Sequence, residues 1–226
     1  MGFGFWRSLL GVTLSACALG CASASSLQRA KTLGVDNAEA SLEVGAAFSV
    51  PLPSPDDFRA APRSDFALRY GVADRVDVGG RIGSTGAEFG VKLLLSSPRS
   101  AFVHLSLLPT IGGLAVFGTA GPGGAFISQL PLLLGFEVLP GTELVLGVRA
   151  VDAVLFGALA NGPSAGHVLF LGGSLGLSWR LSDHLRLHPE LAALAPIWGA
   201  SSAGAGPSFT YDGLWMQAAV GVQFDS

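Results

Sequence analysis

An alternation of apolar with small or polar side chains recurs along this chain from Ser41 onward. In "SLEVGAAFSV" the apolar row is Leu42, Val44, Ala46, Phe48 and Val50, and the residues between them are small or polar. The segments "DFALRYGV", "VDVGGRIG" and "AEFGVKLL" repeat the pattern. A period of two residues is typical of β-strands that have two chemically different faces. The chain is therefore predicted to be all-β.

Ten strands are expected in total. Besides the four segments above, they cover Ala101–Pro109, Phe126–Val138, Glu143–Val151, Val168–Leu181, Leu185–Leu194 and Leu214–Phe224. The alternation is blurred in the fifth and seventh strands, where Leu and Val occupy both faces.

The connections between these strands alternate in length. Short turns are expected at Ala73–Arg75, Ser96–Ser100, Leu139–Thr142 and Ser182–His184, and longer loops at Pro51–Arg63, Gly112–Ala125, Asp152–Gly166 and Pro196–Gly213. Short turns at one end, longer loops at the other and an even strand number are typical of outer-membrane barrels. With ten strands, both chain ends fall at the end with the short turns.

The composition limits the classes of protein to which the chain can belong. Charged residues make up 13% of it and hydrophobic residues 50%, so the charged share is about half that of ordinary soluble domains. Beyond the N-terminus, no apolar run is long enough for a spanning helix. A transmembrane β-barrel and a very apolar soluble β domain both fit. The formal net charge of −3 provides no basic surface for nucleic acid.

Three observations favour a membrane barrel with its apolar face outward. The polar face is mostly Gly, Ala and Ser, which suits a narrow lumen. Its charges have both signs and can pair across a filled interior: Asp65, Arg69, Asp77, Arg81, Glu88, Lys92, Glu137, Arg149, Arg180, Arg186 and Glu190. Phe126 and Phe136 lie on one face of one strand, about 25 Å apart along the membrane normal at a tilt near 40°, which is about the height of a transmembrane apolar band.

Two pairs of lumen charges flank the turn units "RYGVADRVDVGG" and "WRLSDHLRLHPE". Arg69 and Asp77 flank the first turn at matching heights, so we expect them to neutralise each other. Arg180 and Arg186 flank the second turn and need partners elsewhere in the lumen, such as Glu190.

The N-terminus is predicted to be a secretory signal. A short region ending at Arg7 precedes the compact apolar run "SLLGVTLSACALG", and both cysteines of the chain, Cys17 and Cys21, lie here. The region resembles a bacterial lipoprotein signal, with lipidation expected at Cys21 or, in the alternative frame, at Cys17. A third possibility is ordinary cleavage after Ala24 without a lipid. We expect a signal peptide over residues 1–20, a flexible tether over 21–39 and a barrel over 40–226.

As a whole the chain resembles small bacterial outer-membrane β-barrels of Gram-negative cell envelopes. The resemblance rests on the turn units "YGVADRVDVG" and "WRLSDHLRL" and on the final strand "WMQAAVGVQF". It implies contact with outer-membrane lipids, insertion by the barrel-insertion machinery through the C-terminal strand, a monomer, a periplasmic N-terminus and longer loops at the cell surface. One departure is "DS" after Phe224, which leaves the aromatic residue third from the end.

Signals for chemistry are weak. His104 and Ser106 share one face of a strand, as base and nucleophile do in outer-membrane lipid hydrolases, but their parity places them in the lumen and no acid is in place to orient the base. Asp183 and His184 fall in a predicted turn, and the histidines show no metal-ligand spacing. We therefore expect a non-enzymatic barrel without a cofactor, in a structural, binding or minor permeability role. The alternatives are an outer-membrane hydrolase of lipid or peptide and a soluble lipid-carrying barrel.

Overall fold

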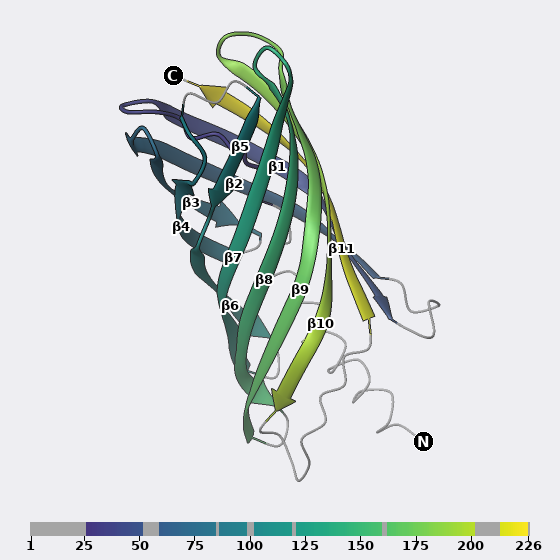
Figure 1. The fold of residues 1–226 in the computed structure, drawn as a ribbon. Helices are drawn as coiled ribbons and strands as arrows, with labels where there is room; N and C mark the ends of the chain where they lie inside the picture. The colour runs from purple at the N-terminus through teal and green to yellow at the C-terminus, as the bar shows by residue number, and fades with distance from the viewer. Residues whose placement is uncertain are drawn as a thin grey trace.

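The strands of this protein form one closed antiparallel barrel (Figure 1). A computed structural model describes residues 26–51, 59–84, 86–98, 102–118, 121–159, 162–201 and 213–225. Within these ranges no helix is long and apolar enough to cross a membrane. The signal peptide expected over residues 1–20, and Cys17 and Cys21 with it, lies outside the described residues.

Eleven strands are assigned within the described residues. They are β1 (Ala38–Pro51), β2 (Arg59–Ala73), β3 (Val76–Gly83), β4 (Gly86–Leu94), β5 (Val103–Leu107), β6 (Thr110–Gly118), β7 (Gly121–Leu139), β8 (Thr142–Leu159), β9 (Gly162–Arg180), β10 (Leu185–Ser201) and β11 (Gly213–Asp225).

The eleven strands fill ten positions around the barrel. β5 and β6 both lie between β4 and β7, so they are two parts of one strand position. The interruption falls at Leu108 and Pro109, where proline has no N–H to contribute to the ladder. The expected count of ten is thus confirmed, although the fifth strand continues past its expected end to Gly118.

The barrel closes where the first and last strands meet. β1 pairs with β11 from Glu39↔Asp225 to Pro51↔Gly213, and β1 pairs with β2 on its other side. β1 starts and β11 ends beside the tight turns that join β2 to β3 and β9 to β10. We call this end of the barrel the turn end and the opposite one the far end.

The apolar row of each strand faces outward, as expected. Large hydrophobic side chains more than 40% exposed are found on nearly every strand, among them Leu42, Val44, Phe66, Leu68, Ile82, Phe89, Ile111, Phe126, Val148, Leu171, Leu191 and Met216. The charged and polar row points into the lumen and is buried. The charged side chains are thus enclosed in the lumen, and the hydrophobic side chains form the outer surface of the barrel.

The strands rise further at the far end than the sequence predicts. Two of the expected loops, Gly112–Ala125 and Asp152–Gly166, are largely strand, because β6, β7, β8 and β9 extend into them. β10 also continues to Ser201, into the expected loop Pro196–Gly213. Gly, Ala and Ser have low intrinsic strand propensity. Here each of these segments pairs with a neighbouring strand, for example at Gly123↔Gly157 and Ala158↔Pro163, and the ladder continues through them.

Three of the four short turns lie where the sequence predicts them, and the fourth, expected at Ser96–Ser100, lies partly outside the described residues. Two residues separate the end of β2 at Ala73 from the start of β3 at Val76, and four separate the end of β9 at Arg180 from the start of β10 at Leu185. Gly141, in the turn between β7 and β8, has φ of +75°, a left-handed conformation that glycine adopts without strain.

A proline in the closing strand tests the barrel. Val220→Pro removes a backbone N–H from β11, which pairs with both β1 and β10, and leaving a carbonyl without its partner costs about 1–3 kcal/mol. We expect the variant to lose the folded, faster-migrating band on unheated gels. Val220→Ala keeps the N–H and serves as the matched control. Equal folding of the two variants would argue against closure through β11.

Candidate functional site: a lumen occupied by the N-terminal segment

Residues 26–34 run inside the barrel, residues 35–37 leave it at the turn end, and we call residues 26–37 the lumen segment. Ser26, Leu27 and Ala30 are 3%, 1% and 0% exposed, and the segment forms no strand. A flexible tether was expected over 21–39. Within it, the described residues from Ser26 onward are bound by side chains of the lumen wall. The reason is that lumen side chains bind the segment's backbone, which a search for periodicity does not detect.

The deep end of the lumen segment is held by Glu190. Its carboxylate accepts hydrogen bonds from the backbone N–H of Ser26 at 2.9 Å and of Leu27 at 2.8 Å. Arg149 lies 3.5 Å from the same carboxylate. Gln223 of β11 donates to the carbonyl oxygen of Leu27 at 2.7 Å. This end of the segment is therefore fixed by both a buried anion and a buried amide.

Charged groups hold the middle of the segment. Arg29 forms ion pairs with Glu39 and Asp225, at 3.5 and 3.7 Å. Lys92 donates to the carbonyl oxygens of Arg29 and Lys31, at 3.3 and 2.9 Å. The Gln28 amide oxygen accepts from Arg69 at 3.0 Å.

Apolar contact reinforces these polar contacts. Ala30 packs against Leu108, Leu133 and Val145 of the wall. The middle of the segment is thus held by side chains from several strands.

The segment leaves the lumen at the turn end. The backbone N–H of Leu33 donates to Asp77 at 3.0 Å, and the hydroxyl of Thr32 donates to the carbonyl of Asp74 at 2.8 Å. Asp36 and Gly71 are joined by a backbone hydrogen bond of 2.9 Å. A Cβ at Gly71 would overlap the carbonyl oxygen of Gly34, so glycine is needed where the segment passes the wall.

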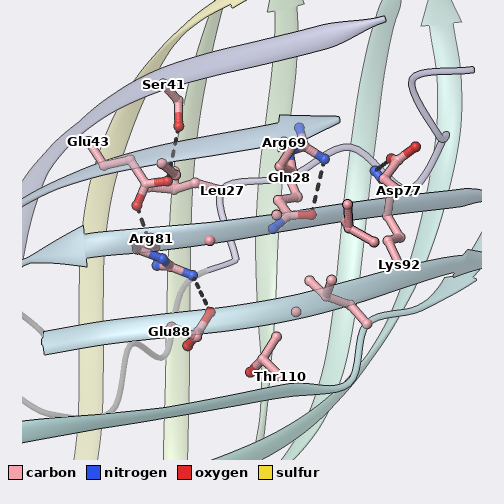
Figure 2. A pocket seen from close by; sticks show the side chains of 16 residues that line it. Leu27, Gln28, Ser41, Glu43, Arg69, Asp77, Arg81, Glu88, Lys92 and Thr110 are labelled. Carbon is pink, nitrogen blue, oxygen red and sulfur yellow. Dashed lines mark hydrogen bonds and ion pairs between the residues drawn. The ribbon is translucent and has the colours of Figure 1, made fainter. Parts of the chain in front are cut away.

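A second network of charges fills the wall beside the segment (Figure 2). Glu43 binds Arg63 at 2.7 Å and Arg81 at 3.3 Å. Arg81 continues to Glu88 at 3.0 Å, and Arg63 to Asp65 at 2.5 Å. The cavity bounded by Leu27, Arg81, Lys92 and their neighbours has a free volume of about 20 Å³, roughly the room that one water molecule needs. The segment and the paired side chains therefore leave little free space in this cavity.

Toward the far end the lumen becomes apolar. A buried cluster, which we call the apolar layer, consists of Ala125, Ile127, Val151, Ala153, Val168, Phe170, Ala192, Leu194 and Trp215. On β10, Ala192 and Leu194 follow Glu190 toward the far end, and on β8, Val151 follows Arg149. The alternation over Glu143–Val151 is blurred because two inward positions there are also hydrophobic: Val151 belongs to this layer, and Val145 packs with Ala30.

Most of the predicted lumen charges are buried in the lumen. These are Asp65, Arg69, Asp77, Arg81, Lys92, Arg149, Arg186 and Glu190. The Glu88 side chain is 18% exposed. Arg180 is an exception: its side chain is 38% exposed at the turn end and binds Asp183 of the adjoining turn at 2.5 Å. Glu137, near the end of β7, accepts a hydrogen bond from the backbone N–H of Gly141 in the adjoining turn.

The partners of these charges differ from those expected. Arg69 pairs with Glu39, and Asp77 pairs with Lys92 at 2.9 Å, so Arg69 and Asp77 do not neutralise each other. Arg186 binds Asp225 at 2.7 Å.

Sequence reasoning missed Glu39, Arg63, Glu143 and Arg29 as lumen groups and did not single out Glu43. The parity of the first strand already placed Glu43 on the polar face, and the same parity extends to Glu39. Arg63 was assigned to a loop. Arg29 was assigned to the tether, and no pattern in the sequence reveals its lumen position.

The candidate catalytic pair is buried and its polar atoms are not hydrogen-bonded. His104 and Ser106 are 1% and 0% exposed in the lumen. Neither ring nitrogen of His104 nor the hydroxyl of Ser106 has a hydrogen-bond partner in the structure. The described ranges contain no group of three or more His, Cys, Asp or Glu that could hold a metal ion. His184 lies in a turn and bonds the Asp225 carbonyl.

Comparisons with known proteins return barrels at low identity. No protein-family model and no curated protein matches the chain. Among solved structures, Neisserial surface protein A is 10% identical with a TM-score of 0.43, over 83% of this chain and 96% of that one. Ail of Yersinia pestis, in complex with sucrose octasulfate, is 9% identical with a TM-score of 0.44, over 85% and 99%.

The outer-membrane protease OmpT of Escherichia coli is 10% identical with a TM-score of 0.40, over 90% of this chain and 98% of that one. The assignment of a closed barrel rests on the strand pairing of this chain itself, and so does every functional argument below.

Trypsin tests the attachment of the lumen segment, which contains Arg29 and Lys31. We expect both sites to resist trypsin in the folded protein and to be cleaved in Glu190→Ala, because removing one partner of a buried ion pair costs about 3–5 kcal/mol and frees the N–H groups of Ser26 and Leu27. Cleavage is followed by peptide mass.

Glu88→Ala is the matched control for this experiment, since Glu88 binds Arg81 and Gln129 and not the segment. Resistance of Glu190→Ala equal to that of Glu88→Ala would contradict the role given to Glu190.

Proposed function

We propose that this chain is an outer-membrane β-barrel without enzymatic activity, closed by its own N-terminal segment, with a structural or binding role rather than that of an open pore. The observation that carries this proposal is the lumen segment, which is hydrogen-bonded to the wall along its length and lies beside a cavity with only about 20 Å³ of free space. A pore needs a continuous water path, and here peptide and paired ions occupy it.

The distribution of polarity supports placement in a membrane. The outward face is hydrocarbon over the middle of the barrel, while the ionised side chains of the lumen wall pair inside. Outward aromatic residues lie near both ends of this face: Tyr70, Trp179 and Phe224 at the turn end and Phe126, Phe156 and Trp198 toward the far end. This is the arrangement of transmembrane barrels, with an apolar band about 25 Å tall between aromatic girdles. A soluble barrel would need the opposite orientation of its strands' faces.

Two variants, each with one arginine on the outward face but at different heights, test the placement of the barrel in a membrane. Val148→Arg places an arginine at a middle position that is 60% exposed, and Leu139→Arg places one at the turn end at a position 63% exposed. In a bilayer the first change is expected to cost about 2–4 kcal/mol of folding free energy and the second about 0–1 kcal/mol. Urea titration of folding into lipid vesicles measures both. Equal costs would contradict a lipid-facing wall.

The closed lumen predicts the behaviour of the protein in planar lipid bilayers. We expect the purified, folded protein to produce no stable conductance steps, because paired side chains and the lumen segment leave no water path. Heat-dependent gel mobility confirms that the inserted sample is folded. Reproducible steps of a size seen with open barrels would refute the proposed closed state and favour a permeability role.

We further propose that the barrel is a monomer in contact with outer-membrane lipids and is recognised by the insertion machinery through β11. The outward row of that strand, from Met216 to Phe224, supports this. A lipid on Cys21, or on Cys17, remains our proposal for the N-terminus, and cleavage after Ala24 is its alternative. Fractionation of membranes tests the location, and labelled fatty acid tests the lipid.

Enzymatic activity is not part of the proposal. A serine nucleophile needs a base within hydrogen-bond reach and a third group that orients the base. His104 and Ser106 have no hydrogen bond to each other, and the lumen segment lies between this part of the wall and the opposite one. A lipid or peptide substrate has no path to them in the closed barrel.

A further inference from the structure

The deep end of the lumen segment is held through its main chain. Glu190 accepts hydrogen bonds from two successive N–H groups, those of Ser26 and Leu27. Gln223 donates to the carbonyl oxygen of Leu27. Leu27 has φ of 45°, a left-handed conformation that a residue other than glycine keeps only where its surroundings impose it. The wall therefore fixes the main chain at this point.

The rest of the segment is held in the same way. Lys92 donates to the carbonyl oxygens of Arg29 and Lys31, and Asp77 accepts from the N–H of Leu33. Asp77 and Lys92 also pair with each other at 2.9 Å on the wall (Figure 2). Every residue other than proline carries the same main-chain N–H and C=O groups. These contacts therefore do not depend on which side chains the occupant of the lumen carries.

Side chains of the segment add selectivity at three positions. Leu27 is 1% exposed, and Arg29 forms ion pairs with two carboxylates of the wall. Ala30 is fully buried and its Cβ packs against Gly135, so a longer side chain has no room there. The side chain of Lys31, in contrast, is exposed. The wall thus fits a peptide with an apolar residue, a cation and a small residue in the order Leu-x-Arg-Ala.

We propose that the lumen wall is a peptide-binding site, and that residues 35–37 reserve it for the chain's own segment by tethering this segment to β1. The proposal deepens the binding role proposed above and rests on it. A short tether gives the attached segment an effective concentration on the order of millimolar, so a free peptide does not displace it from the intact chain. Once the tether is cut, a separate peptide with the pattern Leu-x-Arg-Ala takes the same place.

Cutting the tether tests this proposal. A recognition sequence for a specific protease is inserted between Val35 and Asp36, where Val35 is 48% exposed. The full chain is purified, cleaved, unfolded in urea and refolded in detergent micelles with a large excess of the labelled peptide "SLQRAKTLGV", residues 26–35. We expect one peptide to bind per cleaved barrel. The uncleaved chain with the same insertion is the matched control and is expected to bind none.

Modified peptides test whether the wall recognises the main chain. Replacing the amide N–H of Leu27 by an ester oxygen removes a donor to Glu190. Because this hydrogen bond is to a charged group, its loss is expected to weaken binding by about tenfold to a hundredfold. The same replacement at Arg29 is the matched control and is expected to leave binding unchanged, since neither its N–H nor the carbonyl before it is hydrogen-bonded within the described residues.

Three results would overturn the proposal. The first is equal binding of the two ester peptides, and the second is binding of an Ala30→Leu peptide as tight as that of the parent peptide. The third is a cleaved barrel that takes up no peptide, whether it refolds without one or does not refold in its presence. Heat-dependent gel mobility reports whether the barrel is folded.

Conductance separates this inference from the proposed function. Conductance steps from the uncleaved chain in planar bilayers would refute the closed barrel, whatever the peptides do. If the uncleaved chain gives no steps and the cleaved chain takes up no peptide, only the peptide-binding site is refuted.

Discussion

Every ionised side chain that the barrel encloses must find an opposite charge or a set of hydrogen bonds, since burying an unpaired ion costs several kcal/mol. This constraint shapes the whole interior. Glu43, Arg63 and Arg81 satisfy one another across β1, β2 and β3. Glu190 and Lys92 have partners in the wall, and their remaining hydrogen-bonding capacity is used on the backbone of residues 26–33. The wall and the lumen segment therefore complete each other electrostatically, and neither is fully satisfied alone.

Three levels of the lumen follow from this arrangement. At the turn end the segment passes beside Asp77 and Gly71, which are paired across β2 and β3. At mid-height the first residues of the segment, Ser26 and Leu27, bind Glu190 within the charge network. Beyond that, the apolar layer replaces ions with Ile, Val, Phe, Leu and Trp side chains. The change from ionic to apolar lining at one height gives the interior a direction.

Particular residues show how far the sequence predicts the molecule. The alternation in "DFALRYGV" correctly assigns Phe66 and Leu68 to the outside and Arg69 to the lumen, because side-chain direction in a strand is a local property. The partner of Arg69 was predicted wrongly: Glu39, on the adjacent strand, replaces Asp77 across the turn. Arg63 was assigned to a loop on the basis of the nearby prolines, yet it lies within β2 and pairs with Glu43. The lumen segment gave no signal, since its order comes from hydrogen bonds of its backbone to distant side chains.

The sequence by itself determined the all-β architecture, the ten strand positions, the outward apolar face and the short turns, because each is set by the period and turn chemistry of neighbouring residues. The tertiary structure alone decided which lumen charges pair, the register in which β1 pairs with β11, that the strands continue through Gly- and Ala-rich stretches, and that residues 26–34 run inside the barrel. These depend on register between strands far apart in the chain, as with Ser26 and Glu190, separated by 164 residues. A local pattern carries no information about such contacts.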